Sequence, residues 1–406
     1  MSFLKETLKE AVLAPMVRGS ELAFRQLVRK HGVKVCYSPM LRAEEVIDAY
    51  KKWKRGASSI SDFRHEDGAL LFHDICLDKD ILVIQLCGSD ASDLYEATVI
   101  LLELQISQDL QLIGIDLNLG CPQKCAEDGN FGAFLVENYP DLAIECVSSM
   151  RKAIDLFEKS VQGRDKLGYK KPFLSCKMRL LESNEETISF GKRLEDTGID
   201  MLAVHCRHRI DKFGGEAIIS SGKKLVESLS IPIIINGENI RNLEDVETLI
   251  EETKAHGCMV ARAFLQNPCL LNNSACIDPS FLASNYLDYV EQFPPPSPLY
   301  IQKHLRWIYR IYLQPKKNEI LDYENWKHRL WKFLARPYLS ELEQFRHFIA
   351  LYSKLNKSPL PESLSYIKDP SFHSIRHHKL QDDDVDSDEG FGDAFNTQAI
   401  ELLFHS

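Results

Sequence analysis

The chain has 406 residues, of which 44% are hydrophobic and 27% are charged, and this composition excludes a fibrous, collagen-like or wholly disordered protein. No run approaches the roughly 18 consecutive apolar residues of a membrane span, and charges near the N-terminus interrupt any signal-peptide core. Eleven cysteines are scattered without a C-x-x-C pair. We therefore predict no disulfide framework, no metal site and no membrane partner, and a location in the cytoplasm or also the nucleus.

The net charge of −10 would argue against a nucleic-acid partner if the charge were spread evenly over the chain, but it is not. Six acidic residues lie together in the tract 382–389, near the C-terminus. Between residues 291 and 350, ten Lys and Arg residues outnumber six Asp and Glu residues and are interleaved with Trp307, Trp326 and Trp331. This segment predicts a local surface that is basic and aromatic.

Eight short apolar segments, rich in β-branched residues, recur up to residue 262. The expected strands are 11–16, 33–38, 81–87, 112–118, 173–179, 201–205, 231–236 and 258–261. The helices expected between them are 20–30, 93–107, 141–157, 185–197, 217–228 and 243–252. Continuous apolar character is typical of parallel strands buried on both faces. The alternation predicts an α/β protein with a TIM (β/α)8 barrel, and a doubly wound open sheet is the alternative.

Two stretches, 43–73 and 158–171, interrupt this alternation and are longer than ordinary loops. Beyond residue 262 the pattern changes. A Pro-rich segment at 293–298 precedes the stretch 299–352, which predicts two or three helices with breaks at Pro315 and Pro337. From about residue 358 the chain is too polar to offset its ordering entropy by burial. We predict a barrel domain at 1–270, a smaller all-α domain at 271–358 and a largely disordered acidic tail at 359–406.

Polar side chains occupy six of the eight predicted strand ends, where the active site of such a barrel lies. They are Gln85, Asn118 with Cys121, Lys177 with Arg179, His205 with Arg207, Asn236 and Arg262. Any one of them alone is explained equally well as a satisfied core residue. Because all six ends meet at one rim of the barrel, together they predict a single active site.

The last two strand ends, Asn236-Gly237 and Ala261-Arg262, occupy the corner of a barrel that usually binds phosphate. Gly237 lets the backbone approach an anion closely, and the Arg262 guanidinium offers several donors. The sequence contains no Rossmann or P-loop glycine motif. It therefore predicts a phosphorylated cofactor or substrate at this corner. Lys177 is either a group that stabilises negative charge on a bound ring or a Schiff-base nucleophile.

Seven runs of residues resemble, in order, the signature of the tRNA-dihydrouridine synthases. They are LAPMVR at 13–18, DLNLGCPQ at 116–123, GNFGAFL at 129–135, CKMR at 176–179, VHCRHR at 204–209, NGENI at 236–240 and VARA at 260–263. The N-x-G-C-P-Q run is the most specific of them, and the resemblance spans about residues 11–270. The stretches 18–20 and 41–45 look most like the eukaryotic subfamily that reduces uridines 20a and 20b.

The resemblance implies that a flavin mononucleotide (FMN) lies in the barrel mouth. The residues backing its ring would be Pro15, Met16 and Val17. Those contacting its ring or ribityl chain would be Gln85, Lys177 and His205. The ribityl chain and phosphate would be held by Asn236, Gly237, Glu238, Ala261 and Arg262. Asn118 would orient flavin and substrate, and Cys121 would be the general acid.

The chain departs from the family pattern at three positions. The family usually has Gly and Thr where this chain has Cys206 and His208, and it usually has Gly where this chain has Ala261. None of these changes removes an ionic contact. We expect the Cys206 side chain to leave less room near the flavin ring.

The implied reaction is the reduction of uridine to 5,6-dihydrouridine in the D-loop of tRNA, with 20a and 20b as the expected positions. Reducing the double bond takes a hydride at one carbon and a proton at the other. Reduced flavin is a competent hydride donor, and a thiol with a pKa near 8.5 is protonated at neutral pH. The family restores its flavin with NADPH or NADH. The target base must also leave its stack to reach the ring.

The basic helical domain is expected to bind the tRNA partner through backbone charge and shape. The residues expected to do so are Arg306, Arg310, Lys327 and Arg329. We expect a monomer. One alternative is an FMN barrel that acts on a free small molecule, which would have no need of this basic domain. The other is a tRNA-binding protein without catalysis, against which the presence of Cys121 and Lys177 argues.

Overall fold

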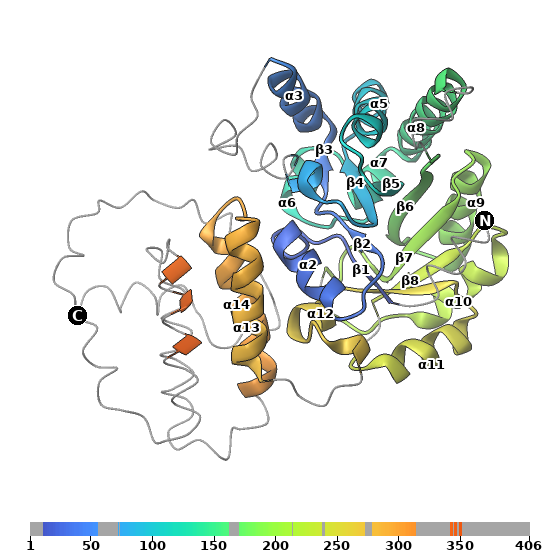
Figure 1. Ribbon diagram of the computed structural model, residues 1–406. Helices are drawn as coiled ribbons and strands as arrows, with labels where there is room; N and C mark the ends of the chain where they lie inside the picture. Colours follow the sequence, from blue (N-terminus) through green and yellow to red (C-terminus); the bar gives the residue numbers. More distant parts are fainter. Residues whose placement is uncertain are drawn as a thin grey trace, which may run out of the picture.

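Eight parallel strands close into a barrel in the computed structural model (Figure 1). The structure describes residues 11–55, 72, 74–161, 170–212, 214–237, 240–272 and 278–313, together with 342, 343, 345, 346, 349 and 350. Several predictions fall outside this described part of the chain. They concern Glu238, Lys327, Arg329, the side chain of Arg310 and the acidic tail at 359–406.

The barrel strands agree with the eight that the sequence predicts. They are β1 (Ala11–Leu13), β2 (Cys36–Tyr37), β4 (Leu82–Cys87), β5 (Leu112–Leu119), β6 (Phe173–Leu180), β7 (Met201–His208), β8 (Ile233–Asn236) and β9 (Gly257–Val260). Each pairs in parallel with its neighbours, and β1 pairs with β9 while β2 pairs with β4. These last pairings close the sheet, so the predicted TIM barrel is confirmed and the open-sheet alternative is wrong.

A short additional strand, β3 (Leu41–Arg42), was not predicted. It pairs with the C-terminal end of β4, where Leu41 lies opposite Leu86. It leads directly into α3 (Ala43–Lys54), so the beginning of the stretch predicted as a long interruption is a helix. Acidic residues in the first turn of α3 and lysines in its last turn complement the helix dipole.

Helices surround the barrel and match the predicted ones within a few residues (Figure 1). They are α2 (Leu22–Lys30), α5 (Ala91–Ser107), α8 (Pro140–Val161), α9 (Asn184–Asp196), α10 (Ile219–Ser228) and α11 (Leu243–Thr253). Shorter ones are α6 (Lys124–Asp128), α7 (Ala133–Asn138), α12 (Arg262–Gln266) and the 3-10 turn η3 (Leu270–Asn272). Side chains cap several helix starts; α9, for example, begins with a capping box between Ser183 and Glu186.

The barrel buries apolar side chains on both faces of its strands, which is why the predicted strands are continuously apolar. Alternate residues point inward, and these include Val12, Val83, Ala203, Ile234 and Met259. The residues between them pack outward against the helices. Inside the barrel, the Phe173 ring takes the space that a side chain at Gly114 would need: a Cβ there would lie 2.3 Å from Phe173 Cζ.

Two further helices, α13 (Pro279–Gln292) and α14 (Pro298–Leu313), lie beside α2 and α12 (Figure 1). They are joined to the barrel by a fully buried polar cluster. The Tyr286 hydroxyl donates to Glu21 Oε1 at 2.9 Å, and His304 Nε2 lies 2.8 Å from the same oxygen. The Phe24 ring stacks on the His304 ring, with centroids 4.2 Å apart. Because Glu21 immediately precedes α2 and His304 lies on α14, this cluster sets the position of α14 on the barrel.

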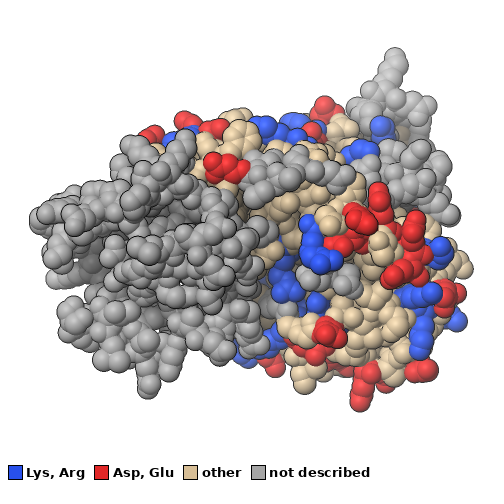
Figure 2. Space-filling view, turned by 90° about the horizontal axis from the view of Figure 1, so that it is seen from below, with Lys and Arg blue, Asp and Glu red and all other residues tan. Residues whose placement is uncertain are grey.

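The charged side chains are unevenly distributed on the surface. Figure 2 shows Lys and Arg side chains near the middle of the visible face, and most of the visible Asp and Glu side chains lie further out. Within the described residues, no helix has both the length and the apolar character that crossing a membrane requires.

Candidate active site

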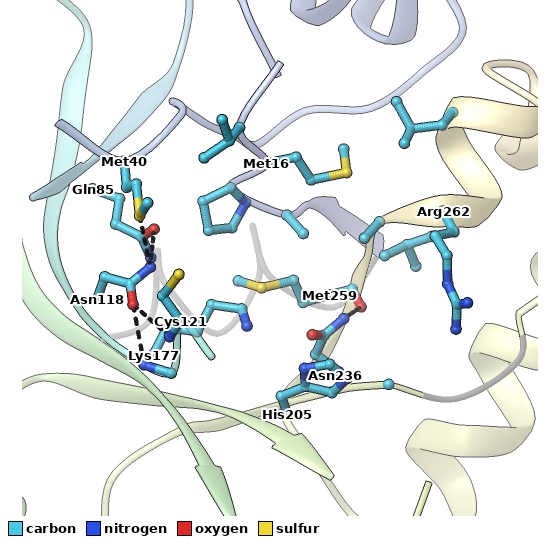
Figure 3. Close-up of a pocket in the computed structure, with 18 of the residues that line it drawn as sticks. Met16, Met40, Gln85, Asn118, Cys121, Lys177, His205, Asn236, Met259 and Arg262 are labelled. Atoms are coloured by element: carbon cyan, nitrogen blue, oxygen red, sulfur yellow. Dashed lines mark hydrogen bonds between the residues drawn. The ribbon is translucent and has the colours of Figure 1, made fainter. Parts of the chain in front are cut away.

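A cavity of about 360 Å³ opens at the C-terminal ends of the barrel strands (Figure 3). Every predicted cofactor or catalytic residue that the structure describes lines it. These are Pro15, Met16, Val17, Gln85, Asn118, Cys121, Lys177, His205, Asn236, Gly237, Ala261 and Arg262. The remaining predicted residue, Glu238, lies outside the described part of the chain.

A chain of hydrogen bonds links the ends of β4, β5 and β6 at the floor of the cavity. The Asn118 amide donates to Gln85 Oε1 at 2.9 Å, and the Gln85 amide donates to Asp116 Oδ2 at 2.7 Å. The Ser175 hydroxyl donates to the other Asp116 oxygen at 2.5 Å. Burial raises the pKa of Asp116 to about 6, although its two donors and the charge of Lys177 lower it. The network therefore holds Gln85 and Asn118 in fixed orientations.

Asn118 also shapes the turn that carries Cys121. Its Oδ1 accepts from the backbone N–H of Gly120 at 3.1 Å and from that of Cys121 at 2.9 Å (Figure 3). On the other side of the turn, Arg179 Nε donates to the Gly120 carbonyl at 2.9 Å. Gly132 (φ 65) packs so closely that a Cβ there would lie 2.9 Å from the Cβ of Cys121. The backbone that carries the thiol is thus held from three directions.

The Cys121 thiol lies at the cavity and is protonated at neutral pH. A hydrogen bond with the Cys125 thiol, followed by burial, raises the pKa of Cys121 well above its ordinary value. A protonated thiol in this position can donate a proton to a molecule in the cavity.

Lys177 lies on β6 and lines the cavity (Figure 3). Burial and then the charge of Arg179 lower the pKa of Lys177 to about 8, although Asp116 raises it. The side chain is therefore charged at neutral pH and close to its titration range.

His205 is neutral in this setting. Burial and the surrounding cations, of which Lys177 is the largest contributor, hold its pKa well below the ordinary value. Arg207 Nη1 lies 3.0 Å from His205 Nε2 and can only donate, so Nε2 is the acceptor and Nδ1 carries the proton. Arg207 Nη1 also donates to the Gly237 carbonyl at 2.6 Å, which ties the end of β7 to the loop after β8.

The predicted phosphate corner is formed by the loops after β8 and β9. The Asn236 amide donates to the Met259 carbonyl at 2.7 Å (Figure 3). Gly237 has a positive φ of 115°, and a Cβ there would lie 2.7 Å from His205 Cδ2. Glycine is therefore required at this point, both by its backbone angle and by its contact with His205. Arg262 begins α12 at the opposite edge of the corner.

The expectation that Cys206 narrows the cavity is wrong. Cys206 is fully buried and does not line the cavity, and its Sγ would lie 2.6 Å from a Cβ placed on Gly222 of α10. The reason is the alternation along β7, where His205 and Arg207 face the cavity and Cys206 faces the helices. Gly222 provides the space that the larger Cys206 side chain needs.

Several lining residues were not predicted as site residues. Met40 lies over Asn118, whose amide nitrogen is 3.6 Å from Met40 Sδ. Lys303 and Trp307, four residues apart on α14, reach the cavity from outside the barrel, and Lys303 donates to the Val17 carbonyl at 3.1 Å. Lys303 and Trp307 belong to none of the family runs, so the sequence did not mark them as site residues. The one available signal was their i, i+4 spacing within the basic and aromatic segment, which places them on the same face of a helix.

The predicted RNA-binding residues are described only in part. Arg306 lies on α14 between Lys303 and Trp307 but does not line the cavity. It is half-buried, and burial lowers its pKa. The assignment of Arg306, Arg310, Lys327 and Arg329 to tRNA binding stays a prediction.

Comparison with known proteins places these features in a family. The model of the family described as "Dihydrouridine synthase (Dus)" matches residues 12–332. A rat protein named tRNA-dihydrouridine(16/17) synthase [NAD(P)(+)]-like is 33% identical over 75% of this chain and 60% of its own length. A human protein named tRNA-dihydrouridine(20a/20b) synthase [NAD(P)+]-like is 32% identical over 64% of this chain and 69% of its own.

The rat relative is named for tRNA positions 16 and 17 and the human relative for positions 20a and 20b, and this chain is almost equally identical to both. The assignment to positions 20a and 20b therefore stays a prediction. The chain spans only 60% of the rat relative, whereas it spans 98% of a Caenorhabditis elegans tRNA-dihydrouridine synthase-like protein to which it is 28% identical. Because the family model matches most of the sequence, and because the residues of the family signature meet in one cavity, the chain belongs to the dihydrouridine synthase family.

Proposed function

We propose that this protein reduces uridine to 5,6-dihydrouridine in the D-loop of tRNA, at positions 20a and 20b, with FMN as bound cofactor and NADPH or NADH as reductant. The observation that carries the proposal is the meeting of a protonated thiol, Cys121, with Asn118, Lys177 and the phosphate corner in one cavity. The names of the rat and human relatives, which specify tRNA dihydrouridine and NAD(P), support it.

The residues of the cavity fit an anionic flavin. Its described lining contains Lys177, Arg179, Arg207, Arg262 and Lys303 and no carboxylate. Arg179 and Arg207 are engaged by backbone carbonyls, which leaves Arg262 for the phosphate and Lys177 for negative charge on the ring.

The remaining cofactor contacts would come from the other predicted residues. Pro15, Met16 and Val17 would cover one side of the ring. Gln85 and His205 would donate to or accept from its polar edge, and the ribityl chain would lie along the stretch from Asn236 to Gly237 and at Ala261. FMN, when bound, supplies the hydride that reduces the 5,6 double bond and is itself reduced by the nicotinamide.

The chain's own residues would perform the other half of the reaction. Cys121 delivers its thiol proton to the ring carbon that does not receive the hydride. Asn118 holds the turn that carries Cys121 and offers the substrate its amide group. Lys177 stabilises negative charge that develops on the flavin or the uracil, a role suited to a cation in a partly desolvated site.

The tRNA partner would approach over α14. Lys303 and Trp307 would lie at the mouth where the flipped nucleotide enters, and Lys and Arg side chains near the middle of the face in Figure 2 would contact the RNA backbone. The predicted contributors Arg306, Arg310, Lys327 and Arg329 would extend this surface along the helical segment. We further propose that the protein acts as a monomer in the cytoplasm or also the nucleus.

The test measures the activity of the purified, FMN-loaded protein and then locates the modified base in tRNA. Purified protein should contain FMN, should oxidise NADPH, and should form dihydrouridine in unmodified tRNA. Mapping the modified base in tRNA from cells with and without the protein then identifies the position. Protein that cannot be loaded with FMN would refute the cofactor assignment, and a loaded enzyme that acts on a free pyrimidine but not on tRNA would favour the small-molecule alternative.

Arg262→Ala should weaken FMN retention about tenfold or more, since it removes a charge-assisted contact with the phosphate. The matched control is Arg241→Ala, an exposed arginine paired with Asp245 outside the cavity lining, which should leave FMN retention unchanged.

A further inference from the structure

A second cysteine, Cys125, lies four residues after Cys121 and differs from it in exposure. Cys121 lines the cavity, at the end of the turn that follows β5. Cys125 lies in the first turn of α6 and is exposed to solvent. The family signature described above does not include the position of Cys125, and its side chain does not line the cavity.

The thiols of Cys121 and Cys125 interact with each other, and Cys125 Sγ also lies 4.0 Å from Gln123 Oε1. A side-chain hydrogen bond between Cys121 and Cys125 is the largest influence on the pKa of both groups. The turn brings them together because Asn118 holds the backbone N–H of Cys121, while Gln123 O accepts from Ala126 N at 3.0 Å and starts α6. A disulfide between them would bring the two sulfurs to about 2 Å from each other.

Cys125 is the more reactive member of the pair. The hydrogen bond from Cys121, the backbone N–H groups of Ala126 and Cys125, and the charge of Arg42 lower its pKa to about 7. Such a thiol is ionised to a larger extent at pH 7 than an ordinary thiol of pKa about 8.5. By contrast, burial raises the pKa of Cys76 to about 12. An exposed thiolate beside a second thiol is the arrangement found where oxidants act selectively.

We propose that Cys125 is a site of oxidation by peroxides, and that Cys121 captures the oxidised sulfur as a reversible disulfide that removes the thiol proton donor from the cavity. The consequence for catalysis rests on the proposed role of Cys121 in uridine reduction. The disulfide itself does not depend on that role.

The chemistry balances with a peroxide as the only added reactant. The Cys125 thiolate attacks one peroxide oxygen, the O–O bond breaks, and Cys125 becomes a sulfenic acid as the other oxygen leaves as hydroxide and takes up a proton. The Cys121 sulfur then attacks the sulfenic sulfur; its proton joins the departing hydroxide, and the S–S bond forms. Two thiols and one hydrogen peroxide give one disulfide and two waters. A dithiol reverses the change by exchange.

The test is carried out on the full-length FMN-loaded protein, treated with hydrogen peroxide at pH 7, alkylated and digested with trypsin without reduction. Trypsin cleaves after Lys124, between the two cysteines, so the disulfide would join peptides 80–124 and 125–151. We expect fragment ions that place the link between Cys121 and Cys125. We also expect at least tenfold loss of uridine reduction that dithiothreitol restores.

Two variants distinguish oxidation at Cys125 from oxidation of other residues of the protein. Cys125→Ser, which keeps an oxygen that can accept the hydrogen bond from the Cys121 thiol, should still reduce uridine, form no link, and lose its activity at least about fivefold more slowly than wild type because the ionised thiol is gone. The control Cys76→Ser removes a half-buried thiol outside the cavity lining and should link and inactivate like wild type.

The outcomes are distinguishable. Oxidation of Cys125 without the link, a link from Cys125 to Cys87 instead, or equally fast inactivation of Cys125→Ser would overturn the proposal. If the untreated protein reduces no uridine in tRNA but the link forms, the proposed function fails while the oxidation site stands.

Discussion

The backbone N–H of Cys121 donates to the Oδ1 of Asn118 at 2.9 Å, and through this bond the Asn118 side chain determines where the Cys121 thiol lies. The same Asn118 side chain donates to Gln85, which is itself bound to the buried Asp116. The position of the thiol is therefore connected to the floor of the barrel rather than to a mobile loop.

Replacing Asn118 should impair the proton-transfer half of the reaction more than flavin binding. In Asn118→Ala, two backbone N–H groups of the Cys121 turn lose their acceptor, and we expect uridine reduction to fall about 10²-fold because misplacement of a reacting group by 1 Å has effects of this size. FMN content should change little. Single-turnover reduction of tRNA measures the first effect and absorbance of released flavin the second. A larger loss of FMN than of turnover would contradict the assigned role.

Cys121→Ala should separate the two half-reactions. The variant should bind FMN and oxidise NADPH at the wild-type rate but reduce uridine on the order of 10²–10⁴-fold more slowly, which is the usual contribution of a general acid. Cys76→Ala serves as the control because that thiol lies outside the cavity lining. Single-turnover rates with tRNA within a few-fold of wild type would mean that another group donates the proton.

The affinity of the flavin-free protein for FMN should depend on pH through Lys177. The pKa of Lys177 is about 8, so the side chain is charged below this pH and neutral above it. We expect the Kd for FMN to rise as the pH increases through 8. Lys177→Arg keeps its charge over the whole range and should give a flat profile, whatever its absolute affinity. A wild-type profile as flat as that of the variant would exclude Lys177 as the titrating contact.

The buried Glu21–His304 pair should contribute strongly to stability. His304→Ala leaves the buried Glu21 carboxylate without its His304 partner, and we expect a loss of about 3–5 kcal/mol in the free energy of unfolding. Tyr286→Phe removes one hydrogen bond to the same carboxylate and should cost about 1 kcal/mol. Arg193→Ala, which breaks an exposed ion pair with Asp141, is the control and should cost less than about 1 kcal/mol. Urea unfolding measures all three, and equal losses in His304→Ala and Arg193→Ala would show that the cluster does not hold α14.

Charge reversal at Lys327 and Arg329 should weaken tRNA binding and leave FMN content unchanged. Each phosphate contact that is lost should reduce the slope of log affinity against log salt by about 0.7–0.9. Filter binding at several salt concentrations gives this slope. Reversal of Lys223 and Lys224 on α10, which leaves the predicted RNA-binding residues intact, is the control for total charge. A salt slope that is the same in wild type and in the Lys327/Arg329 variant would remove these residues from the tRNA surface.

The sequence by itself determined the barrel and many of the residues that line its cavity. Strands buried on both faces must be continuously apolar, and this local pattern located all eight of them. The ends of parallel strands meet at one rim, so residues as distant along the chain as Gln85 and Arg262 could be assigned to one cavity before any contact was known. The resemblance to dihydrouridine synthases could also be seen in the sequence, because it depends on short local runs of residues.

Only the tertiary structure decided which way individual side chains point and which distant segments reach the cavity. Cys206 was expected near the flavin, but the alternation along β7 and the absence of a side chain at Gly222 turn it toward α10. Lys303 and Trp307 line the cavity because His304, between them on α14, is bound to Glu21 at the start of α2. Contacts of this kind join residues more than 280 positions apart, and they depend on how helices pack rather than on any local pattern in the sequence.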